Sequence, residues 1–110
     1  MRSIFLMLSL LLPLTLLGSS ASLAQSKLDS SILSYDGKDF VRTETTLMKD
    51  GQSAANTKLD PDSAAYKALV EKHSYIGPAT VFGHSYQADY APLIGADGKL
   101  TGALFVGIPK

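Results

Sequence analysis

Residues that favour one face alternate with a period of two in the later part of the chain, as Tyr86, Ala88, Tyr90 and Pro92 do. Runs rich in Val, Ile, Thr and aromatic side chains, separated by short segments with Gly or Asp, are typical of β-strands joined by hairpins. Asp36-Gly37, Gly83-His84 and Asp97-Gly98 are such segments, and each predicts an antiparallel turn. The pattern predicts strands over residues 31–35, 40–47, 75–82, 86–94 and 100–108.

One amphipathic helix is expected between the second and third strands. Asp60 followed by Pro61 is typical of a helix start, because Asp60 can accept hydrogen bonds from the free amides and Pro61 suits the first turn. We therefore expect Asp60 to be the N-cap of a helix of about three turns, which is near the average length. The residues that helical spacing places on its buried face are Tyr66, Leu69, Val70 and His73.

The order of the predicted elements is two strands, a helix and three strands. Residues 49–58 are polar and contain Asp50-Gly51, so they predict a loop before the helix. The last strand, residues 100–108, is largely apolar on both faces, which is typical of a central strand that is covered on each side. These features predict the α+β class: a five-stranded antiparallel sheet with one short crossover helix on one face.

The N-terminus has the three parts of a secretory signal peptide. Arg2 supplies the positive charge, residues 4–17 are almost wholly apolar, and Ser22-Leu23-Ala24 is a small-x-small cleavage pattern. We expect residues 1–24 to be the signal peptide, cleavage near Ala24, and a periplasmic or secreted location. The alternative is an uncleaved membrane anchor, although a span needs about 20 apolar residues and this run is shorter.

Composition narrows the function classes for residues 25–110, which suffice for one small domain. The chain has ten basic and ten acidic residues, and loss of Arg2 leaves nine against ten, a formal net charge of −1. This balance gives no electrostatic reason to expect nucleic acid as a partner. The chain contains no cysteine, which excludes thiol nucleophiles, disulfides and cysteine-ligated metals.

Residues 25–110 contain several short motifs in which Gly, Tyr and Phe recur. They are Asp36-Gly37-Lys38-Asp39-Phe40-Val41-Arg42, Thr45-Thr46-Leu47, Leu59, Ala65-Tyr66, Leu69, the run 75–86, Tyr90-Ala91-Pro92-Leu93 and the run 97–107. Together they resemble single Cache sensor domains of the Cache 3/Cache 2 fusion type, which are found outside the membrane in bacterial chemoreceptors and sensor kinases. The resemblance implies a PAS-like sheet and a cavity for a small organic ligand, often an organic acid or amino acid, between the sheet and its long central loop.

The resemblance has two departures. Family members usually begin with a long helix before the first strand, and residues 25–29 stand in its place here. They also usually continue into a transmembrane helix and a signalling module, whereas this sequence stops at Lys110. We therefore expect residues 25–110 to be a Cache-like sensor domain that lacks most of the long helix. It would report through a homodimer or through a membrane receptor or kinase partner.

Arg42 is the first candidate for a ligand-binding residue, because it is the only arginine after residue 25. A guanidinium fork matches a carboxylate bidentately, so a strand arginine beside the cavity would anchor an anionic ligand. The alternative is a solvated strand arginine that pairs with Glu44 or Asp39.

Tyr75, Tyr86 and Tyr90 are the other candidates for ligand binding. Each offers an apolar wall and a hydroxyl group, the combination that small-molecule sites use. The alternative for each is a place in the core with its hydroxyl at the rim. Tyr86 and Tyr90 share a strand face by period two. Thr80 and Asp89 are weaker candidates, and Asp89 points to the opposite face from the tyrosines.

No motif indicates a metal site, a cofactor or catalysis. His73 and His84 are the only histidines and lack the close pairing of a zinc or haem site. The sequence has no glycine-rich phosphate loop, G-x-S-x-G elbow or H-E-x-x-H motif. We therefore expect a protein that is not an enzyme, without catalytic residues, metal or cofactor.

Two functions remain open. The first is an exported small-ligand-binding sensor module that acts in signal transduction, such as chemotaxis, through a partner. The alternative is a structural or interaction protein that dimerises or docks on a membrane receptor without a small ligand. This second reading follows because a sheet face without the long helix would expose apolar surface, and such surface favours association.

Overall fold

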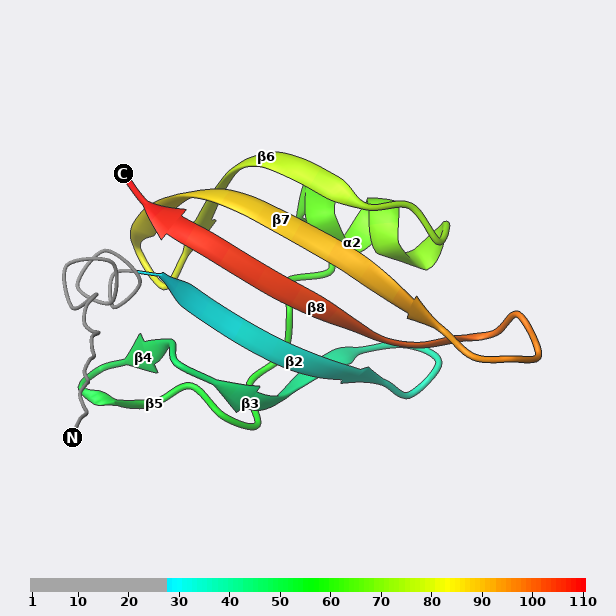
Figure 1. Ribbon diagram of the computed structural model, residues 1–110. Helices are drawn as coiled ribbons and strands as arrows, with labels where there is room; N and C mark the ends of the chain where they lie inside the picture. The colour runs from blue at the N-terminus through cyan, green and yellow to red at the C-terminus, as the bar shows by residue number, and fades with distance from the viewer. Residues whose placement is uncertain (1–27) are drawn as a thin grey trace, which may run out of the picture.

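The computed structural model describes residues 28–110, so the predicted signal peptide lies outside the described residues. Five strands form one antiparallel sheet in the order β3 (Phe40–Thr45), β2 (Asp29–Tyr35), β8 (Leu100–Pro109), β7 (His84–Ile94) and β6 (Tyr75–Val81) (Figure 1). The strands that come first and last in the chain, β2 and β8, are neighbours in this sheet. The α+β class and the antiparallel five-stranded sheet are therefore confirmed.

The turn between β6 and β7 lies one residue earlier than expected. Phe82 and Gly83 have positive φ angles of 49° and 81°, which is the backbone of a two-residue type I′ hairpin. Val81 and His84 pair across this turn. His84 is therefore the first residue of β7 rather than part of the turn.

The single helix of the described residues, α2 (Ala64–Val70), begins after Ser63 rather than after Asp60. The Ser63 hydroxyl accepts a hydrogen bond from the backbone N–H of Tyr66 at 3.1 Å, as an N-cap does. Asp60 Oδ1 instead accepts the backbone N–H of Asp62 at 2.8 Å. The expectation that Asp60 caps the helix was wrong, because Asp60 stabilises a separate turn before it.

The helix is shorter than the predicted three turns and covers seven residues. Lys72 adopts a φ of 65°, and the hydrogen bonds from Lys72 and His73 back into the last turn close a Schellman motif. Ala65 and Leu69 are its buried residues. Val70 and His73, which were expected on the buried face, are exposed, because a helix that ends at residue 70 cannot direct His73 toward the sheet.

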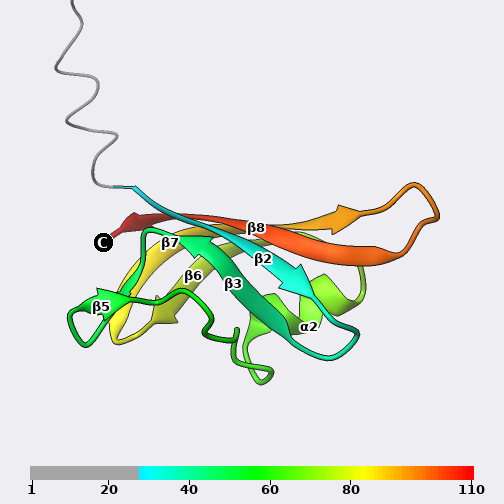
Figure 2. The same ribbon diagram turned by 90° about the horizontal axis from the view of Figure 1, so that it is seen from below.

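The core lies on one side of the sheet. Figure 2 shows α2 and a small hairpin, β4 (Met48–Lys49) with β5 (Gln52–Ser53), on the same side. Apart from Met48, the hairpin falls inside the predicted loop 49–58, where Asp50 and Gly51 with positive φ form its turn. The buried apolar residues are Leu33, Phe40, Leu47, Ala54, Leu59, Ala65, Leu69, Val81, Tyr86, Ala88, Tyr90, Ala103 and Phe105.

The other side of the sheet is uncovered within residues 28–110 (Figure 2). We call it the open sheet face. On β8, Ala103 and Phe105 are buried against the core, whereas alternate residues on the other face remain accessible. The expectation that β8 is covered on both sides was therefore wrong for the described part of the chain. The exposed apolar residues of this face include Ile32, Ile76, Leu104, Val106 and Ile108, with exposed fractions of 44%, 70%, 41%, 44% and 54%.

Residues 54–59 return along the outer edge of β3. The backbone N–H of Arg42 donates to Thr57 O at 2.8 Å, and Asn56 N–H donates to Arg42 O at 2.7 Å. Leu59 N–H donates to Phe40 O at 2.9 Å. This segment is therefore held against the strand that carries Arg42, and it leads the chain to α2.

Candidate ligand-binding site

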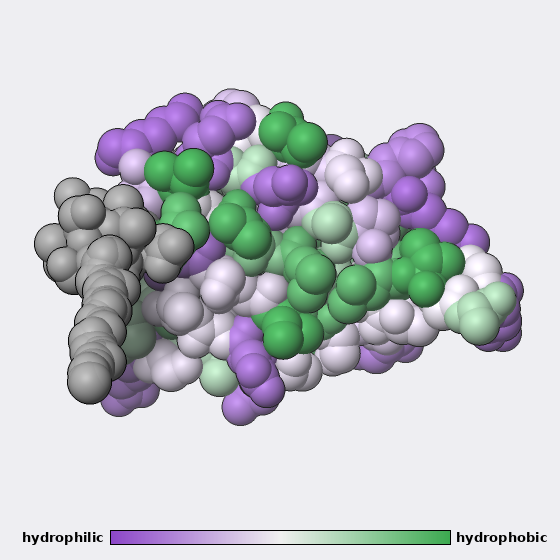
Figure 3. All heavy atoms as spheres, viewed as in Figure 1, coloured by the Kyte–Doolittle hydropathy of each residue, from purple (hydrophilic) through white to green (hydrophobic). Residues whose placement is uncertain are grey.

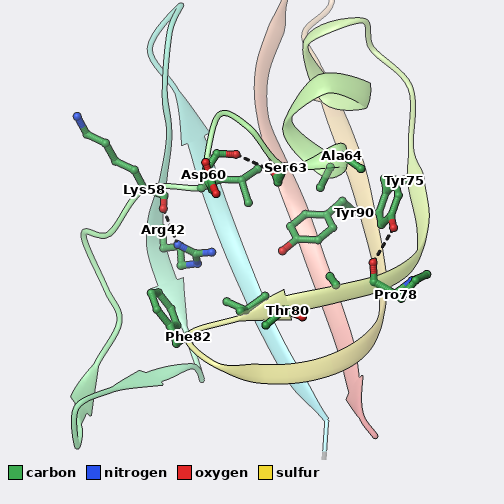
Figure 4. Close-up of a pocket in the computed structure, with 14 residues that line it drawn as sticks. Arg42, Lys58, Asp60, Ser63, Ala64, Tyr75, Pro78, Thr80, Phe82 and Tyr90 are labelled. Carbon is green, nitrogen blue, oxygen red and sulfur yellow. Dashed lines mark hydrogen bonds between the residues drawn. The ribbon is translucent and has the colours of Figure 1, made fainter.

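A cavity of about 430 Å³ lies on the core side of the sheet, between β3, residues 58–65 and β6 (Figure 4). Its volume is within the range of small-molecule sites. The polar residues that line it are Arg42, Lys58, Asp60, Ser63, Tyr75, Thr80 and Tyr90. The apolar residues are Leu59, Ala64, Ala65, Pro78, Ala79, Val81 and Phe82.

Arg42 lies in this cavity because alternation along β3 turns its side chain toward the core, beside the buried Phe40. The side chain is not solvated, since Arg42 is only 3% exposed. Its Nη1 donates to Thr57 Oγ1 and to Lys58 O, both at 3.1 Å. The guanidinium carbon lies 5.0 Å from the ring centroid of Phe82, which is a cation–π distance.

Arg42 has no carboxylate partner among the described residues. Asp39, one of the two expected partners, instead accepts Lys58 Nζ at 3.2 Å, and Glu44 is exposed. Burial lowers the pKa of Arg42, although Tyr90 opposes the shift, and an arginine remains protonated in proteins. A buried cation without a counter-charge is costly, so this position favours an anion in the cavity.

Tyr90 faces Arg42 across the cavity, with its hydroxyl turned toward the guanidinium (Figure 4). It is 2% exposed, and its ring packs against Phe105 at a centroid distance of 4.8 Å. Burial raises the pKa of Tyr90, while Arg42 lowers it in part. The hydroxyl is therefore protonated at neutral pH and can donate a hydrogen bond to an anion.

Tyr75 supplies a wall of the cavity rather than a free polar group. Its hydroxyl donates to Pro78 O at 2.6 Å (Figure 4). The ring lies against Gly77, where an added Cβ would be 3.0 Å from the Tyr75 hydroxyl oxygen. Thr80, the weaker candidate, also lines the cavity from β6.

Tyr86 is the one predicted ligand-binding residue that lies outside the cavity. It shares the core face of β7 with Tyr90, as expected, but it lies four residues from Tyr90, which is about 13 Å along the strand. Its hydroxyl donates to Asp29 Oδ2 at 2.8 Å, and its ring meets Phe105 edge-on at 5.9 Å. Burial and the bond to Asp29 raise the pKa of Tyr86 to about 12.

The sequence analysis missed Phe82 and Thr57 as contacts of Arg42. Phe82 was placed at the end of a strand, but its positive φ sends the ring beneath Arg42. Thr57 was part of a polar loop, and only the pairing of that loop with β3 brings its hydroxyl to the guanidinium. A positive φ is rare at a phenylalanine, so the sequence alone does not predict this backbone conformation at Phe82.

The remaining polar candidates lie elsewhere. Asp89 is exposed on the open sheet face, and His73 lies beside Glu71, with 4.0 Å between Nδ1 and Oε1. Over residues 28–110, no three His, Asp or Glu side chains stand close enough to hold a metal ion. Within the same span, no helix has the length and apolarity needed to cross a membrane.

A model of one protein family, the Cache 3/Cache 2 fusion domain, matches residues 29–110. This chain belongs to the Cache 3/Cache 2 fusion domain family. Cache domains are sensor modules for small ligands in signalling rather than catalysts, and they are typically extracellular or periplasmic parts of receptors and kinases. No curated protein and no solved structure matches the chain.

Proposed function

We propose that this protein is an exported sensor module that binds a small carboxylate, of the organic acid or amino acid class, in the cavity beside Arg42. The observation that carries this proposal is a buried guanidinium that faces a small-molecule cavity without a carboxylate partner in the described residues. A bound anion would neutralise that charge, which would otherwise remain desolvated at a cost in free energy.

The donors around Arg42 suit a carboxylate. A guanidinium has five N–H groups. Nη1 donates to both Thr57 Oγ1 and Lys58 O, and the Tyr90 hydroxyl is a further side-chain partner of Arg42. The other N–H groups form a planar fork, which matches the two oxygens of a carboxylate. The hydroxyl of Tyr90 adds a donor from the opposite wall.

The rest of the cavity suits a short apolar tail. Ala64, Ala65 and Val81 are among its apolar lining residues. Asp60 is the acidic residue of the lining, and it is exposed, with Oδ1 already bound to a backbone N–H. An amino acid ligand would therefore have to place its ammonium group near Asp60, while an organic acid would need only Arg42 and Tyr90.

Export and signalling complete the proposal. The apolar run of residues 4–17 and the small-x-small pattern at Ala24 support cleavage there and a periplasmic or secreted product. The family supports a role in sensing, such as chemotaxis, through a membrane receptor or kinase partner. The domain is residues 25–110 in this proposal.

The alternative function, an interaction protein that dimerises or docks on a receptor without a small ligand, is favoured by a different observation. The open sheet face exposes several large apolar side chains, and such patches usually mark interaction sites. Binding of a ligand in the cavity distinguishes the two functions, because the alternative requires no occupant there.

The test is thermal denaturation of the purified protein against pairs of compounds that differ only in an amino group, such as alanine with propionate. A ligand at 100 times its dissociation constant stabilises the folded state by about 2.7 kcal/mol, which shifts the melting temperature of a small domain by roughly 10 °C or more. We expect such a shift from one short carboxylic acid and none from its amide. No shift with any acid of the panel would contradict the proposal.

A further inference from the structure

We propose that the open sheet face binds the same face of a second copy of this chain, about a two-fold axis that runs along β8. This inference concerns the side of the sheet opposite the cavity, and it does not depend on ligand binding. Figure 3 shows the apolar side chains as a band that follows β8 and β2 across this face. An apolar band on one face of a sheet is suited to packing against the face of a second sheet.

The register of the sheet fixes which side chains form the face. Leu104 on β8 pairs with Ile32 on β2 and with Ala91 on β7. In the same way, Val106 pairs with Ser30 and with Asp89. Directly paired residues of antiparallel strands share a face, so these are two parallel rows of three side chains across the centre of the sheet.

A two-fold axis along β8 exchanges β2 and β7 between the copies. The large Ile32 then faces the small Ala91 of the second copy, while Leu104 faces its own counterpart. Large side chains opposite small ones are the arrangement that lets two apolar faces interdigitate. An isologous dimer requires this kind of self-complementarity.

The charges select the same axis. β2, β7 and β8 carry no Lys or Arg, and Asp89 is an acidic residue at the centre of the face. The axis along β8 sets Asp89 opposite the hydroxyl of Ser30 and keeps the two aspartates about 10 Å apart or more. An axis across the strands, midway between the two rows, would set Asp89 against Ala91, where a buried carboxylate finds no donor. An axis through the Val106 row would instead set the two aspartates against each other.

The size of the face predicts a weak dimer. Five strands of this length cover roughly 20 by 25 Å, which is less than the area of about 800 Å² that each partner contributes to a standard stable interface. We therefore expect the association to depend on protein concentration, with monomer at low micromolar and dimer at high micromolar concentration.

The test uses protein purified from the exported fraction of cells that express the full chain, with its N-terminus read by mass spectrometry. Sedimentation equilibrium is measured for the wild type, Leu104→Lys and Leu104→Glu. Because Leu104 faces itself, each variant brings two like charges together, and we expect its dimer dissociation constant to rise by roughly a hundredfold or more. An equimolar mixture of the two variants brings opposite charges together and restores association. Val70→Lys, an exposed apolar residue on α2, is the matched control and leaves the dimer unchanged.

Each other outcome overturns the proposal. A wild type that is monomeric at every concentration contradicts the proposal. A Leu104→Lys variant that dimerises as tightly as the wild type also contradicts it. If both variants lose dimerisation and their equimolar mixture does not recover it, then Leu104 does not face its own counterpart. A wild type that is monomeric only when it retains residues 1–24 assigns the face to the chain's own N-terminal segment. Leu104 is already 41% exposed, and a melting temperature within a few degrees of wild type verifies that both variants fold.

Discussion

The substitution Arg42→Met separates the structural role of the guanidinium from its proposed role in ligand binding. It removes the hydrogen bonds to Thr57 Oγ1 and Lys58 O, each worth roughly 1.5–3 kcal/mol as bonds from a charged donor. It also removes a buried charge, whose desolvation costs several kcal/mol. The two effects oppose each other, so the unfolding free energy of the ligand-free protein should change by about 2 kcal/mol or less.

Ligand binding should respond far more strongly. Loss of a bidentate contact removes two charge-assisted hydrogen bonds to the carboxylate, or roughly 3–6 kcal/mol. The dissociation constant should therefore rise by at least about a hundredfold. Isothermal titration calorimetry with the acid that gives the largest thermal shift measures this change, and urea denaturation measures the stability. Arg42→Lys keeps the positive charge but lacks the planar guanidinium. Its dissociation constant for the acid should lie between those of the wild type and Arg42→Met.

Two results would refute this reasoning. A Met variant that binds the acid as tightly as the wild type would show that Arg42 is not the anchor. A fall in unfolding free energy of more than about 4 kcal/mol would show that the guanidinium mainly ties residues 54–59 to β3. Glu44→Met, on the same strand but exposed, is the control and should leave both quantities unchanged.

Further predictions concern the capping, packing and ionisation of particular residues. Ser63→Ala should lower the unfolding free energy by about 1 kcal/mol as a lost N-cap, and by more than Asp60→Ala does in the same urea titration. Gly107→Ala should cost roughly 1–3 kcal/mol, because a Cβ there would lie 2.5 Å from the ring of Phe105 and 2.9 Å from that of Tyr86; a thermal melt like that of the wild type would contradict this. The folded pKa of Tyr86, about 12, exceeds the value of about 10 in an unfolded chain. The stability that this hydroxyl contributes is thus complete below pH 10 and is lost as the pH rises toward 12. In Tyr86→Phe the unfolding free energy should therefore fall less between pH 10 and 12 than it does in the wild type. Urea denaturation at each pH measures this difference.

Alternation and turn residues were enough to predict the sheet. Period two set the core face of β7 through Tyr86, Ala88 and Tyr90, and all three are buried. The helix was less well predicted, because Asp60 and Ser63 are both good capping residues and only the backbone of Lys72 decides where the helix ends. Local chemistry therefore located the element, while its two ends depended on hydrogen bonds that the pattern does not specify.

The candidate site was predicted in part. Arg42, Tyr75 and Tyr90 line the same cavity, although β3 and β6 are the opposite edges of the sheet, because all three strands turn these residues toward one small core. Tyr86 lies on the same face of β7 as Tyr90 and is also a tyrosine, but it does not line the cavity. Position along a strand relative to the covering loop is a tertiary property, and a single sequence carries little information about it.

The segment that runs beside β3 also limits how the protein can associate. Its backbone bonds to Phe40 and Arg42 occupy the outer edge of that strand, so the edge offers few free groups to another chain. At the opposite edge, β6 contains Pro78, which has no N–H to donate. Open strand edges are where sheets extend into polymers and fibrils. With one edge occupied and the other interrupted, the sheet resists continuous growth, so a molecule with an apolar face can remain in solution at high concentration.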